Sequence, residues 1–532
     1  MPPPKRRLGL LLTIVALGLF LRLVWLSDFP PSLNWDEASL GYNAYSLLKT
    51  GHDEWGVAFP AIFRAFGDYK LPGYVYLAVP AVKLFGLTVP GVRLPSALAG
   101  TMLIFVTYLL ARAFFSDTRI SLLASFLVAV EPWTWFLSRV ALEANLAALL
   151  IALGLLFILR RQTVWAVFFL GLSVWTYNSA RLFVPILLLS FWLILRRLKL
   201  LPIHYLLLTI LFIPMFFQLL SPVGLARFNW VSPIDQGAVN RINELRSSSQ
   251  LPAPLSRFIY NRPSYLLFTI TINYFGHFSP DFLFLKGGSH YQFNIPRSGL
   301  LSVINLPLFY LGIFLIFKSG NVNHKPLLIL WLFLAPLPGS LTRDAPHTLR
   351  AMTLLPAPML VISFAAVTLW QRLKKFSLQI ASVYIIILFL SLVYYFITLI
   401  PVYRSTYSWA WQYGFKEAVS YVKAHYDEYD RIIITKKYGE PHIFFLFYWP
   451  VDPVAYQSDP GLVRYFRSDW YWVDSFAKFR FVNDWEMKDI VSVPHPGEKY
   501  LIVAGPENIP AGTVLSQISF LDGSPAFIIK EL

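Results

Sequence analysis

The stretch LGLLLTIVALGLFLRLVWLSDFPPSLNWDEASLGYNAYSLLKTG (residues 8–51) places an acidic pair soon after the first long apolar run. The run 8–26 is long enough to cross a bilayer, which takes about 17–25 apolar residues. Asp36 and Glu37 then stand close to hydrocarbon, where a charge is costly unless it has a partner or a function. This pair raises the question of whether it caps a helix or carries chemistry.

The composition of the whole chain extends this picture. Of 532 residues, 56% are hydrophobic and only 14% are charged, whereas an average soluble domain is about 25% charged. The repeated apolar runs therefore indicate a polytopic α-helical membrane protein. The chain has no cysteine, which excludes disulfides, thiolate metal sites and thiol nucleophiles.

Basic residues set the predicted orientation. The apolar runs fall at roughly 8–26, 93–114, 120–137, 140–159, 163–178, 181–197, 203–221, 299–317, 326–341, 350–370 and 378–400. Every second gap holds a basic cluster: Lys5, Arg6 and Arg7; Arg112 and Arg119; Arg160 and Arg161; Arg196, Arg197 and Lys199; Lys318 and Lys325; Arg372, Lys374 and Lys375. By the positive-inside rule these gaps are cytoplasmic, which gives about eleven spans and a cytoplasmic N-terminus. The basic residues behind the formal charge of +16 thus cluster in the predicted cytoplasmic gaps between spans. We therefore predict no nucleic-acid partner.

Two large outer loops follow, at about 27–92 and 222–298. The apolar run 71–87 lies in the first loop, and counting it as a span would invert every later loop. We therefore expect it to lie at the outer interface as a helix, like 36–48, whose apolar stripe is typical of an interfacial helix. A twelfth span is the alternative. The stripe consists of Leu40, Ala44, Leu47 and Leu48.

The chain is predicted to have two domains: a transmembrane domain at 1–400 and a soluble extracytoplasmic α/β domain at 401–532. The segment GFKEAVSYVKAHY (414–426) has helical spacing, and 431–435, 500–505 and 526–530 are typical of strands. Within the second outer loop, the polar stretch NWVSPIDQGAVNRINELRSSSQLPAP (229–254) is typical of a loop with a short helix.

Ionisable side chains near the membrane ends gather in the outer loops. Carboxylates and guanidinium groups at the headgroup level suit a reaction on a phosphate-bearing lipid, because cations hold the phosphate while a carboxylate activates a hydroxyl. No phosphate-cradling loop, His-Glu-x-x-His or Asp-x-Asp pair occurs. The candidate site residues are Asp36, Glu37, Asp68, Lys70, Arg139, Glu143, Tyr177, Arg181, Arg343, His347 and Arg350.

Each candidate also has an ordinary structural explanation. Asn34 and Glu37 fit the capping-box pattern, and Arg139 and Glu143 have the spacing of an intrahelical ion pair. Arg350 could snorkel from its helix, and a lone histidine makes no metal site. The ordinary roles of the others are turn capping for Asp68, interfacial anchoring for Lys70, helix entry for His347 and packing for Tyr177 and Arg181.

The motifs resemble the start of the GT-C membrane glycosyltransferases, nearest to protein O-mannosyltransferases and lipid A aminoarabinose transferases. WDEASLGYNAYSLLKTG (35–51), GDYKLPGYVYLAVPAVKLFG (67–86) and VRLPSALAG (92–100) carry the likeness in order and spacing, and PHTLRAMTLLP (346–356) extends it. The sequence departs from the family pattern in having Lys70-Leu71-Pro72 rather than Lys-Pro-Pro. It also lacks the zinc-type ligands of the aminoarabinose branch, so the sugar stays open.

The resemblance implies inverting transfer of one sugar from a polyprenyl-phosphate donor to a hydroxyl acceptor at the outer face of the cytoplasmic membrane. It assigns Asp36 as the catalytic base with Glu37 beside it, Lys70 and Arg350 to the carrier phosphate, and Glu143 to the acceptor or sugar. Arg343 is a further candidate for the phosphate. The remaining candidates for substrate binding are Asp68, Arg139, Tyr177, Arg181 and His347.

No cofactor is predicted, and the sequence leaves a divalent metal open. The predicted partners are the lipid-linked donor, membrane lipids and an acceptor that is a protein, a lipid or a glycan. Two other functions compete. A lipid-sugar flippase would need charged or broken helices near the middle of the membrane, and a polysaccharide polymerase or ligase would not need the acidic pair.

Overall fold

The computed structural model divides the chain into two compact units. The helical unit comprises residues 1–22, 98–138 and 143–394, and the mixed unit comprises residues 23–97, 139–142 and 395–532. The structure describes residues 4–195, 202–222, 224, 230–320, 322–373, 377–491 and 497–532. The predicted cytoplasmic residues Arg196, Arg197, Lys199, Lys374 and Lys375 lie outside the described residues.

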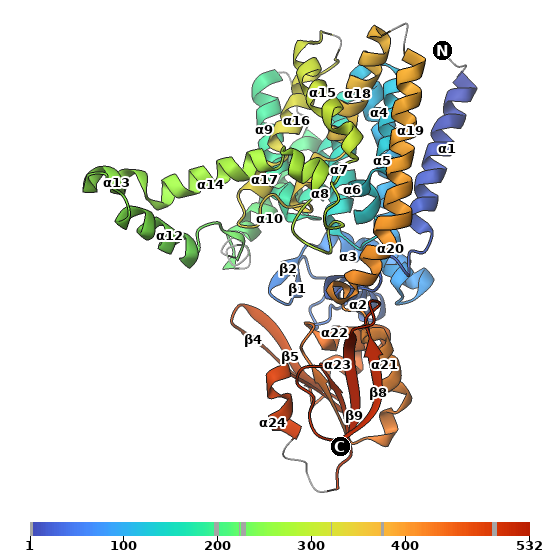
Figure 1. Ribbon diagram of the computed structural model, residues 1–532, viewed down its shortest axis with the longest axis vertical. Coiled ribbons are helices and arrows are strands. Elements are labelled where there is room, and N and C mark those ends of the chain that lie inside the picture. Colours follow the sequence, from blue (N-terminus) through green and yellow to red (C-terminus); the bar gives the residue numbers. More distant parts are fainter. Residues whose placement is uncertain are drawn as a thin grey trace. The chain divides into compact units, whose positions relative to one another are not determined.

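Apolar helices of different lengths build the helical unit (Figure 1). They are α1 (Pro4–Leu23), α4 (Val89–Phe115), α5 (Thr118–Val130), α6 (Pro132–Leu137), α7 (Glu143–Leu159), α8 (Thr163–Val174), α9 (Asn178–Leu195), α10 (Pro202–Leu219), α15 (Leu306–Lys318), α16 (Lys325–Leu334), α17 (Leu337–Ser340), α18 (Ala357–Arg372) and α19 (Ser377–Tyr394). Between α10 and α15 come α12 (Gln236–Ser247), α13 (Ala253–Ile259) and α14 (Arg262–Gly276), with the short helices η1 (Asp281–Leu285) and η2 (Val303–Asn305). The predicted short helix of the second outer loop is therefore confirmed as α12.

Every predicted apolar run contains a helix, and three helices are long and apolar enough to cross a membrane. These are Val89–Phe115, Pro202–Leu219 and Leu378–Thr406. The shorter apolar helices are Thr118–Val130, Glu143–Leu159, Thr163–Val174, Asn178–Leu193, Val303–Lys318 and Lys325–Ser340. The total of about eleven spans stays a prediction.

Two buried ionisable side chains in the helical unit have hydrogen-bond partners. Arg22 donates to Val128 O and Ala129 O at 2.9 and 3.0 Å, which are carbonyls of the last turn of α5. The carboxylate of Glu131 accepts from Ser302 N at 2.7 Å and Asn305 Nδ2 at 2.6 Å. A buried ion without such partners would cost several kcal/mol, so these contacts hold α1, α5 and η2 in place.

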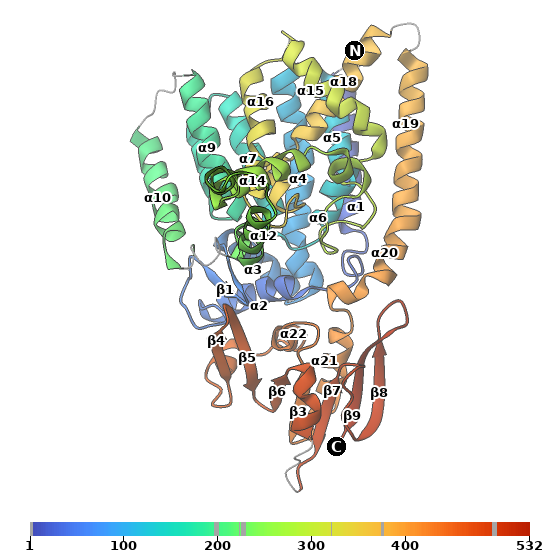
Figure 2. The same ribbon diagram turned by 60° about the vertical axis from the view of Figure 1, so that its left-hand side comes forward.

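A seven-stranded mixed sheet forms the C-terminal part of the mixed unit, in the order β4-β5-β6-β3-β7-β9-β8 (Figure 2). Strand β3 runs parallel to β6 and β7, and the other pairs are antiparallel. The strands are β3 (Arg431–Thr435), β4 (Val463–Arg467), β5 (Trp470–Phe476), β6 (Phe479–Val482), β7 (Tyr500–Ala504), β8 (Thr513–Ser519) and β9 (Pro525–Glu531). The helices around it are α20 (Ile400–Thr406), α21 (Phe415–Ala424), α22 (Pro441–Tyr448), α23 (Pro453–Gln457) and α24 (Met487–Val491), with η5 (Tyr395–Leu399), η6 (Ser408–Trp411), η7 (Tyr426–Glu428) and η8 (Asp484–Glu486).

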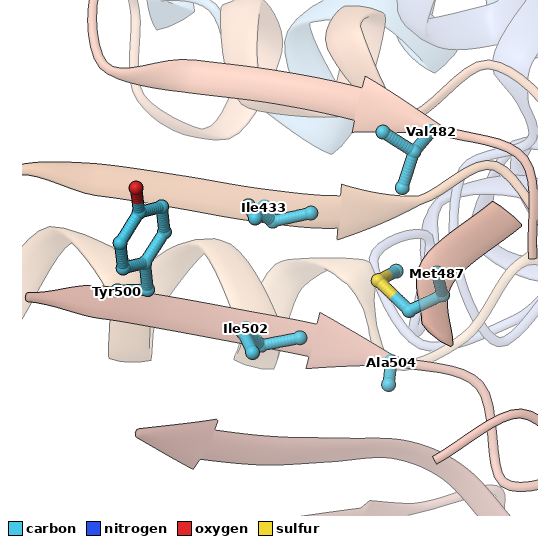
Figure 3. Packing of buried hydrophobic residues seen from close by; sticks show 6 residues of the cluster. All are labelled: Ile433, Val482, Met487, Tyr500, Ile502 and Ala504. Carbon is cyan, nitrogen blue, oxygen red and sulfur yellow. The ribbon is translucent and has the colours of Figure 1, made fainter. Parts of the chain in front are cut away.

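The central strands β3 and β7 are buried along nearly their whole length and form the core of this sheet. Met487 of α24 covers one face of the central strands, where it packs with side chains of β3, β6 and β7 (Figure 3). The other members of this cluster are Ile433, Val482, Tyr500, Ile502 and Ala504. The three strands and the helix that the sequence predicted in the tail are therefore confirmed as β3, β7, β9 and α21.

Helix α2 (Trp35–Thr50) is buried on more faces than the sequence predicted. A single apolar stripe was expected, as on a helix at the membrane interface, but nearly every residue from 37 to 47 is buried. The interfacial location itself stays a prediction. The helix packs against α3 (Pro72–Phe85) on one side and against α22, a helix beside the C-terminal sheet, on another. A helix covered on several faces needs no single stripe, so the stripe identified only part of its contacts.

The first loop and the C-terminal tail are thus one packed unit rather than two separate pieces. Tyr42 donates to Val451 O at 3.2 Å, and Gln457 donates to Asp53 O at 2.8 Å. The predicted division of the chain into domains at 1–400 and 401–532 stays a prediction. Helix α3 has 14 residues and is about 21 Å long, which is short of the roughly 30 Å hydrocarbon core and favours the interfacial placement of 71–87.

A glycine tests this packing. A Cβ at Gly41 of α2 would lie 2.6 Å from Val92 Cγ2 and 2.7 Å from Phe447 Cε2. We expect Gly41→Ala to destabilise the protein by about 1–3 kcal/mol, because neither contact can yield without moving its helix. The measurement is the apparent Tm of purified protein in detergent.

Gly9→Ala is the matched control, since no atom lies within 4 Å of a Cβ built at Gly9 in α1. Alanine favours a helix by about 1 kcal/mol over glycine, so the control is expected to match or exceed the parent Tm. An unchanged Tm in Gly41→Ala would contradict the packing of α2 between α4 and α22.

Candidate active site

A capping box starts α2 and fixes the acidic pair. Asn34 Oδ1 accepts from Glu37 N at 2.9 Å, and Glu37 Oε2 accepts from Asn34 N at 3.3 Å. The capping role predicted for Asn34 and Glu37 is therefore confirmed. Negative charge in the first turn also interacts favourably with the helix dipole. The sequence Asn34-Trp35-Asp36-Glu37 thus determines where the helix begins.

Glu37 forms a fully buried ion pair with Arg93, whose Nε and Nη2 each lie 2.9 Å from a carboxylate oxygen. A further hydrogen bond comes from Ala141 N at 2.8 Å. Arg93 Nη1 also donates to Leu26 O and Pro30 O. Since each Glu37 oxygen already accepts two hydrogen bonds, this acid is placed as a structural partner and not as a free base.

Asp36 has a different environment from its neighbour. Its Oδ1 lies 3.1 Å from Lys70 Nζ, and the side chains of Asp36 and Lys70 are 36% and 16% exposed. Lys70 ends β2 (Asp68–Lys70), which pairs antiparallel with β1 (Phe63–Ala65). The structure therefore brings together the two residues that the sequence assigned as base and phosphate contact, and it leaves the carboxylate partly open. Asp68 lies opposite Ala65 at the hairpin turn.

The C-terminal sheet contacts the same hairpin. Trp470 of β5 packs edge-on against Trp35, the residue before Asp36, and stacks near Phe66. Tyr471 exchanges a 2.6 Å hydrogen bond with Tyr69, the residue before Lys70. The sheet therefore supports both neighbours of the Asp36–Lys70 pair. No short sequence signal could indicate Trp470 or Tyr471, because their partners lie far away along the chain.

A buried polar cluster joins the same two parts of the mixed unit. His442 of α22 lies 3.6 Å from Glu54 and 3.5 Å from Glu440. Burial raises the pKa of Glu440, while the charge of His442 opposes this effect. Among the residues that the structure describes, no group of three or more histidines, cysteines and acids has the geometry of a metal site.

Arg139 is buried and donates to backbone carbonyls, at 3.1 Å to Phe29, 2.7 Å to Val24 and 2.8 Å to Trp25. It therefore holds the segment that follows α1. Glu143 begins α7, whereas Arg139 lies before that helix. The predicted intrahelical ion pair between Arg139 and Glu143 is thus wrong, because the backbone between these residues is not helical.

In the helical unit, the loop 341–350 holds the remaining basic candidates. Arg350 begins the short helix η3 (Arg350–Leu354) and donates to Thr342 Oγ1 at 2.7 Å and Asp344 O at 3.3 Å. His347 Nδ1 accepts from the backbone amides of Leu349 and Arg350. These contacts place His347 as the residue that shapes the entry to η3.

Three other candidates of the helical unit have structural partners. Arg343 Nη1 lies 3.0 Å from Asp235 Oδ2, and Arg343 Nη2 donates to Trp230 O at 2.9 Å. Arg181 in α9 is buried and donates to Val174 O at 3.0 Å. Tyr177 immediately precedes the same helix. These positions give structural roles to Arg181 and Arg343, and their substrate contacts stay predictions.

The candidates are thus distributed over both compact units. The mixed unit contains Asp36, Glu37, Asp68, Lys70 and Arg139, and the helical unit contains Glu143, Tyr177, Arg181, Arg343, His347 and Arg350. Arg93 is the residue of the first group that the sequence did not single out. The signal for it was present, since an arginine in an apolar run requires a partner.

Comparisons with solved structures agree with this fold. ArnT from Cupriavidus metallidurans in the apo state matches with a TM-score of 0.54 and 13% identity, over 98% of this chain and 98% of that chain. The same enzyme bound to undecaprenyl phosphate matches with a TM-score of 0.53 and 11% identity, over 99% and 97% of the two chains. The Archaeoglobus fulgidus oligosaccharyltransferase in complex with Zn and sulfate matches with a TM-score of 0.50 and 15% identity, over 82% of this chain and 61% of that chain.

No protein-family model matches the chain, and no curated protein matches it significantly by sequence. At these identities the structural neighbours establish the fold alone. The chain therefore has the same fold as these structures, and ArnT matches it over nearly its whole length.

The buried pair gives a first test of this site. We expect Glu37→Gln to destabilise the protein by about 3–5 kcal/mol, because it leaves the buried Arg93 guanidinium without its counter-charge. Folded yield and apparent Tm in detergent measure the effect.

Glu244→Gln is the matched control. Its partner Arg241 lies 2.7 Å away but both side chains are exposed, so its loss costs at most about 1 kcal/mol. A Glu37→Gln variant as stable as the control would contradict the structural role of the pair.

His277, beside the Arg350 loop, gives a pH test. Its Nδ1 donates to Asn273 O at 2.7 Å, and its Nε2 accepts from His347 N. Burial lowers the pKa of His277 from 6.5 to about 4, and the charge of Arg350 acts in the same direction. Between these two pH values the imidazole of His277 is protonated in the unfolded chain and neutral in the folded chain. The stabilisation is therefore complete above pH 6.5 and is lost as the pH falls towards 4.

We expect His277→Gln to flatten this pH dependence, which amounts to at most about 3 kcal/mol between the two pH values. Denaturant or thermal unfolding across this range provides the measurement. His324→Gln, at an exposed position of the same unit, is the control and should retain the parent slope. Equal slopes in parent and His277→Gln proteins would show that His277 is not held neutral by burial.

Proposed function

We propose that the protein is an inverting glycosyltransferase that moves a single sugar from a polyprenyl-phosphate donor to a hydroxyl acceptor. The observation that carries this proposal is the 3.1 Å contact between Asp36 and Lys70. It joins a carboxylate that can take a proton to an ammonium that can bind a phosphate, within a GT-C fold whose neighbour ArnT has been solved with undecaprenyl phosphate.

In the proposed step, Asp36 takes the proton of the acceptor hydroxyl as its oxygen bonds to the anomeric carbon. The bond from that carbon to the phosphate oxygen breaks, and the electron pair leaves with the polyprenyl phosphate. Lys70 stabilises the charge that builds on this phosphate. A phosphate is already a good leaving group, so the step needs no general acid. Attack opposite the leaving group inverts the anomeric centre.

The resting contact between Asp36 and Lys70 has a consequence for this step. A phosphate that binds Lys70 takes some of the three N–H donors that the ammonium otherwise offers to Asp36. Donor binding therefore weakens the pair and frees the carboxylate for the hydroxyl.

The helical unit supplies the other proposed contacts. Arg350 is proposed to bind the same phosphate, and its hydrogen bond to Thr342 would orient it beforehand. Arg343 is a second candidate for the phosphate, although its present partner is Asp235. Glu143 is proposed to act at the sugar or the acceptor. The proposal places the reaction at the outer face of the cytoplasmic membrane, because the loops that carry these residues alternate with the basic ones.

A single transferred sugar is favoured over an oligosaccharide. The chain matches nearly the full length of ArnT but only 61% of the oligosaccharyltransferase chain. A flippase or a polymerase is the alternative, and neither requires a carboxylate–ammonium pair in the first loop.

We expect Asp36→Asn to lower the transfer rate by about 10²–10⁴-fold while the protein folds normally, since the asparagine cannot accept the proton. Purified protein in native lipid is incubated with a panel of polyprenyl-phosphate sugars, and released polyprenyl phosphate is measured.

Asp281→Asn is the matched control for this variant. Asp281 also pairs with a lysine, Lys286, at 2.8 Å, but its side chain is 57% exposed. The control should retain the parent rate. Transfer by Asp36→Asn at the parent rate would remove its role as base. A parent protein that moves the donor across vesicles without releasing polyprenyl phosphate would instead be a flippase.

A further inference from the structure

The segment 251–276 of the helical unit has an unusual distribution of apolar side chains. Helix α14 exposes Leu267, Phe268, Ile272 and Phe275, and Phe268 is 65% exposed. These positions lie at i, i+1, i+5 and i+8, so they share one helix face. Phe258 in α13 extends the apolar surface and is 75% exposed. A helix in water would place polar residues on such a face.

The protein-facing side of α14 is the polar one. Asn273 is buried and donates to Ser340 O and Thr342 O at 3.2 and 3.1 Å. Tyr274 donates to Phe333 O in α16 at 2.8 Å. Polar groups thus anchor the helix to the protein, while its apolar groups point away. This inside-out pattern is expected of a helix whose exposed face meets hydrocarbon.

Length and orientation argue against a spanning helix. Helix α14 has 15 residues and is about 22 Å long, which is short of the roughly 30 Å core. It is not among the helices apolar enough to cross a membrane. In Figure 1 it runs across the direction of α15 and α16 and continues into α13. A helix with these properties lies along a bilayer rather than through it.

The charge of the segment identifies the surface that it meets. Residues 251–276 contain Arg257 and Arg262 and no acid or lysine. Both arginines are exposed and flank the apolar residues of α13 and the start of α14. Their guanidinium groups suit the phosphates of anionic headgroups.

We propose that α13 and α14 form a lipid-docked arm. The arm lies in the interface at the outer face of the membrane, with its apolar side chains among the acyl chains and with Arg257 and Arg262 at the headgroups. The sequence predicted this segment only as part of an outer loop. The arm does not depend on the proposed function. Asn273 at the end of α14 connects the arm to the loop 341–350 through its hydrogen bond to Thr342 O, so lipid docking positions the segment that carries Arg350.

The absence of native cysteine allows a direct test. Single variants Phe258→Cys, Phe268→Cys and Asn243→Cys receive a nitroxide in the full-length protein, reconstituted in nanodiscs of phosphatidylethanolamine and phosphatidylglycerol. Collisions with oxygen, which concentrates in hydrocarbon, are compared with collisions with a water-soluble nickel complex. Asn243 is an exposed polar position on α12 and serves as the aqueous control.

We expect labels at 258 and 268 to have an oxygen-to-nickel collision ratio several-fold above that at 243. Labels at 258 and 268 that collide with the nickel complex as often as the label at 243 would overturn the proposal. So would labels shielded from both reagents, since that result indicates coverage by protein, either a second copy or a partner.

A second measurement tests the arginines. The double variant Arg257→Gln, Arg262→Gln should lower the collision ratio at 258 in nanodiscs with phosphatidylglycerol and leave it unchanged in phosphatidylcholine alone. Arg241→Gln, at an exposed arginine on α12, is expected to have no effect in either lipid. An equal ratio in parent and double-variant proteins in the anionic nanodiscs would overturn the headgroup role.

Discussion

The buried ion pair of Glu37 and Arg93 is the interaction on which the arrangement of the mixed unit depends. One carboxylate accepts hydrogen bonds from the guanidinium, from the N-cap of its own helix and from the backbone of Ala141. The guanidinium in turn holds two carbonyls that precede the helix. A pair removed from water tolerates little misalignment, because either partner alone would be a buried charge. It therefore fixes the position and rotation of α2.

The two adjacent acids divide structure and chemistry between them. Successive residues of a helix point about 100° apart, so fixing Glu37 inward turns Asp36 towards the β1–β2 hairpin and Lys70. The C-terminal sheet supports that hairpin through Trp470 and Tyr471. A rigid shell around a partly exposed pair is what precise positioning of a reacting group requires. The tail is thereby part of the structure that orients the candidate base.

The sequence predicted local features well and distant contacts poorly. The capping box, α21 and the strands β3, β7 and β9 follow from spacings within a few residues, and the structure contains all of them. The resemblance located Asp36 and Lys70, and the structure joins them. Arg93 was missed because its partner lies 56 residues away in the chain.

The contact of helix α2 with α22 was missed for the same reason. A periodic stripe indicates that one face is buried, but it cannot reveal that α22 covers another face from the far end of the chain. Arg139 and Arg181 have contacts of another kind that the sequence did not indicate. Both have the residue type expected of a phosphate or substrate contact, and both donate to backbone carbonyls. Only the folded chain shows which arginines are already occupied.

The central claim is that Lys70 exchanges Asp36 for the phosphate of the lipid carrier. Solid-state NMR can measure the dipolar coupling between lysine ¹⁵Nζ and the ³¹P of bound polyprenyl phosphate in membranes, with Lys70→Arg used to assign the signal. The account predicts a direct coupling that disappears in the Lys70→Arg protein. Bound carrier with no coupling to Lys70 would contradict it.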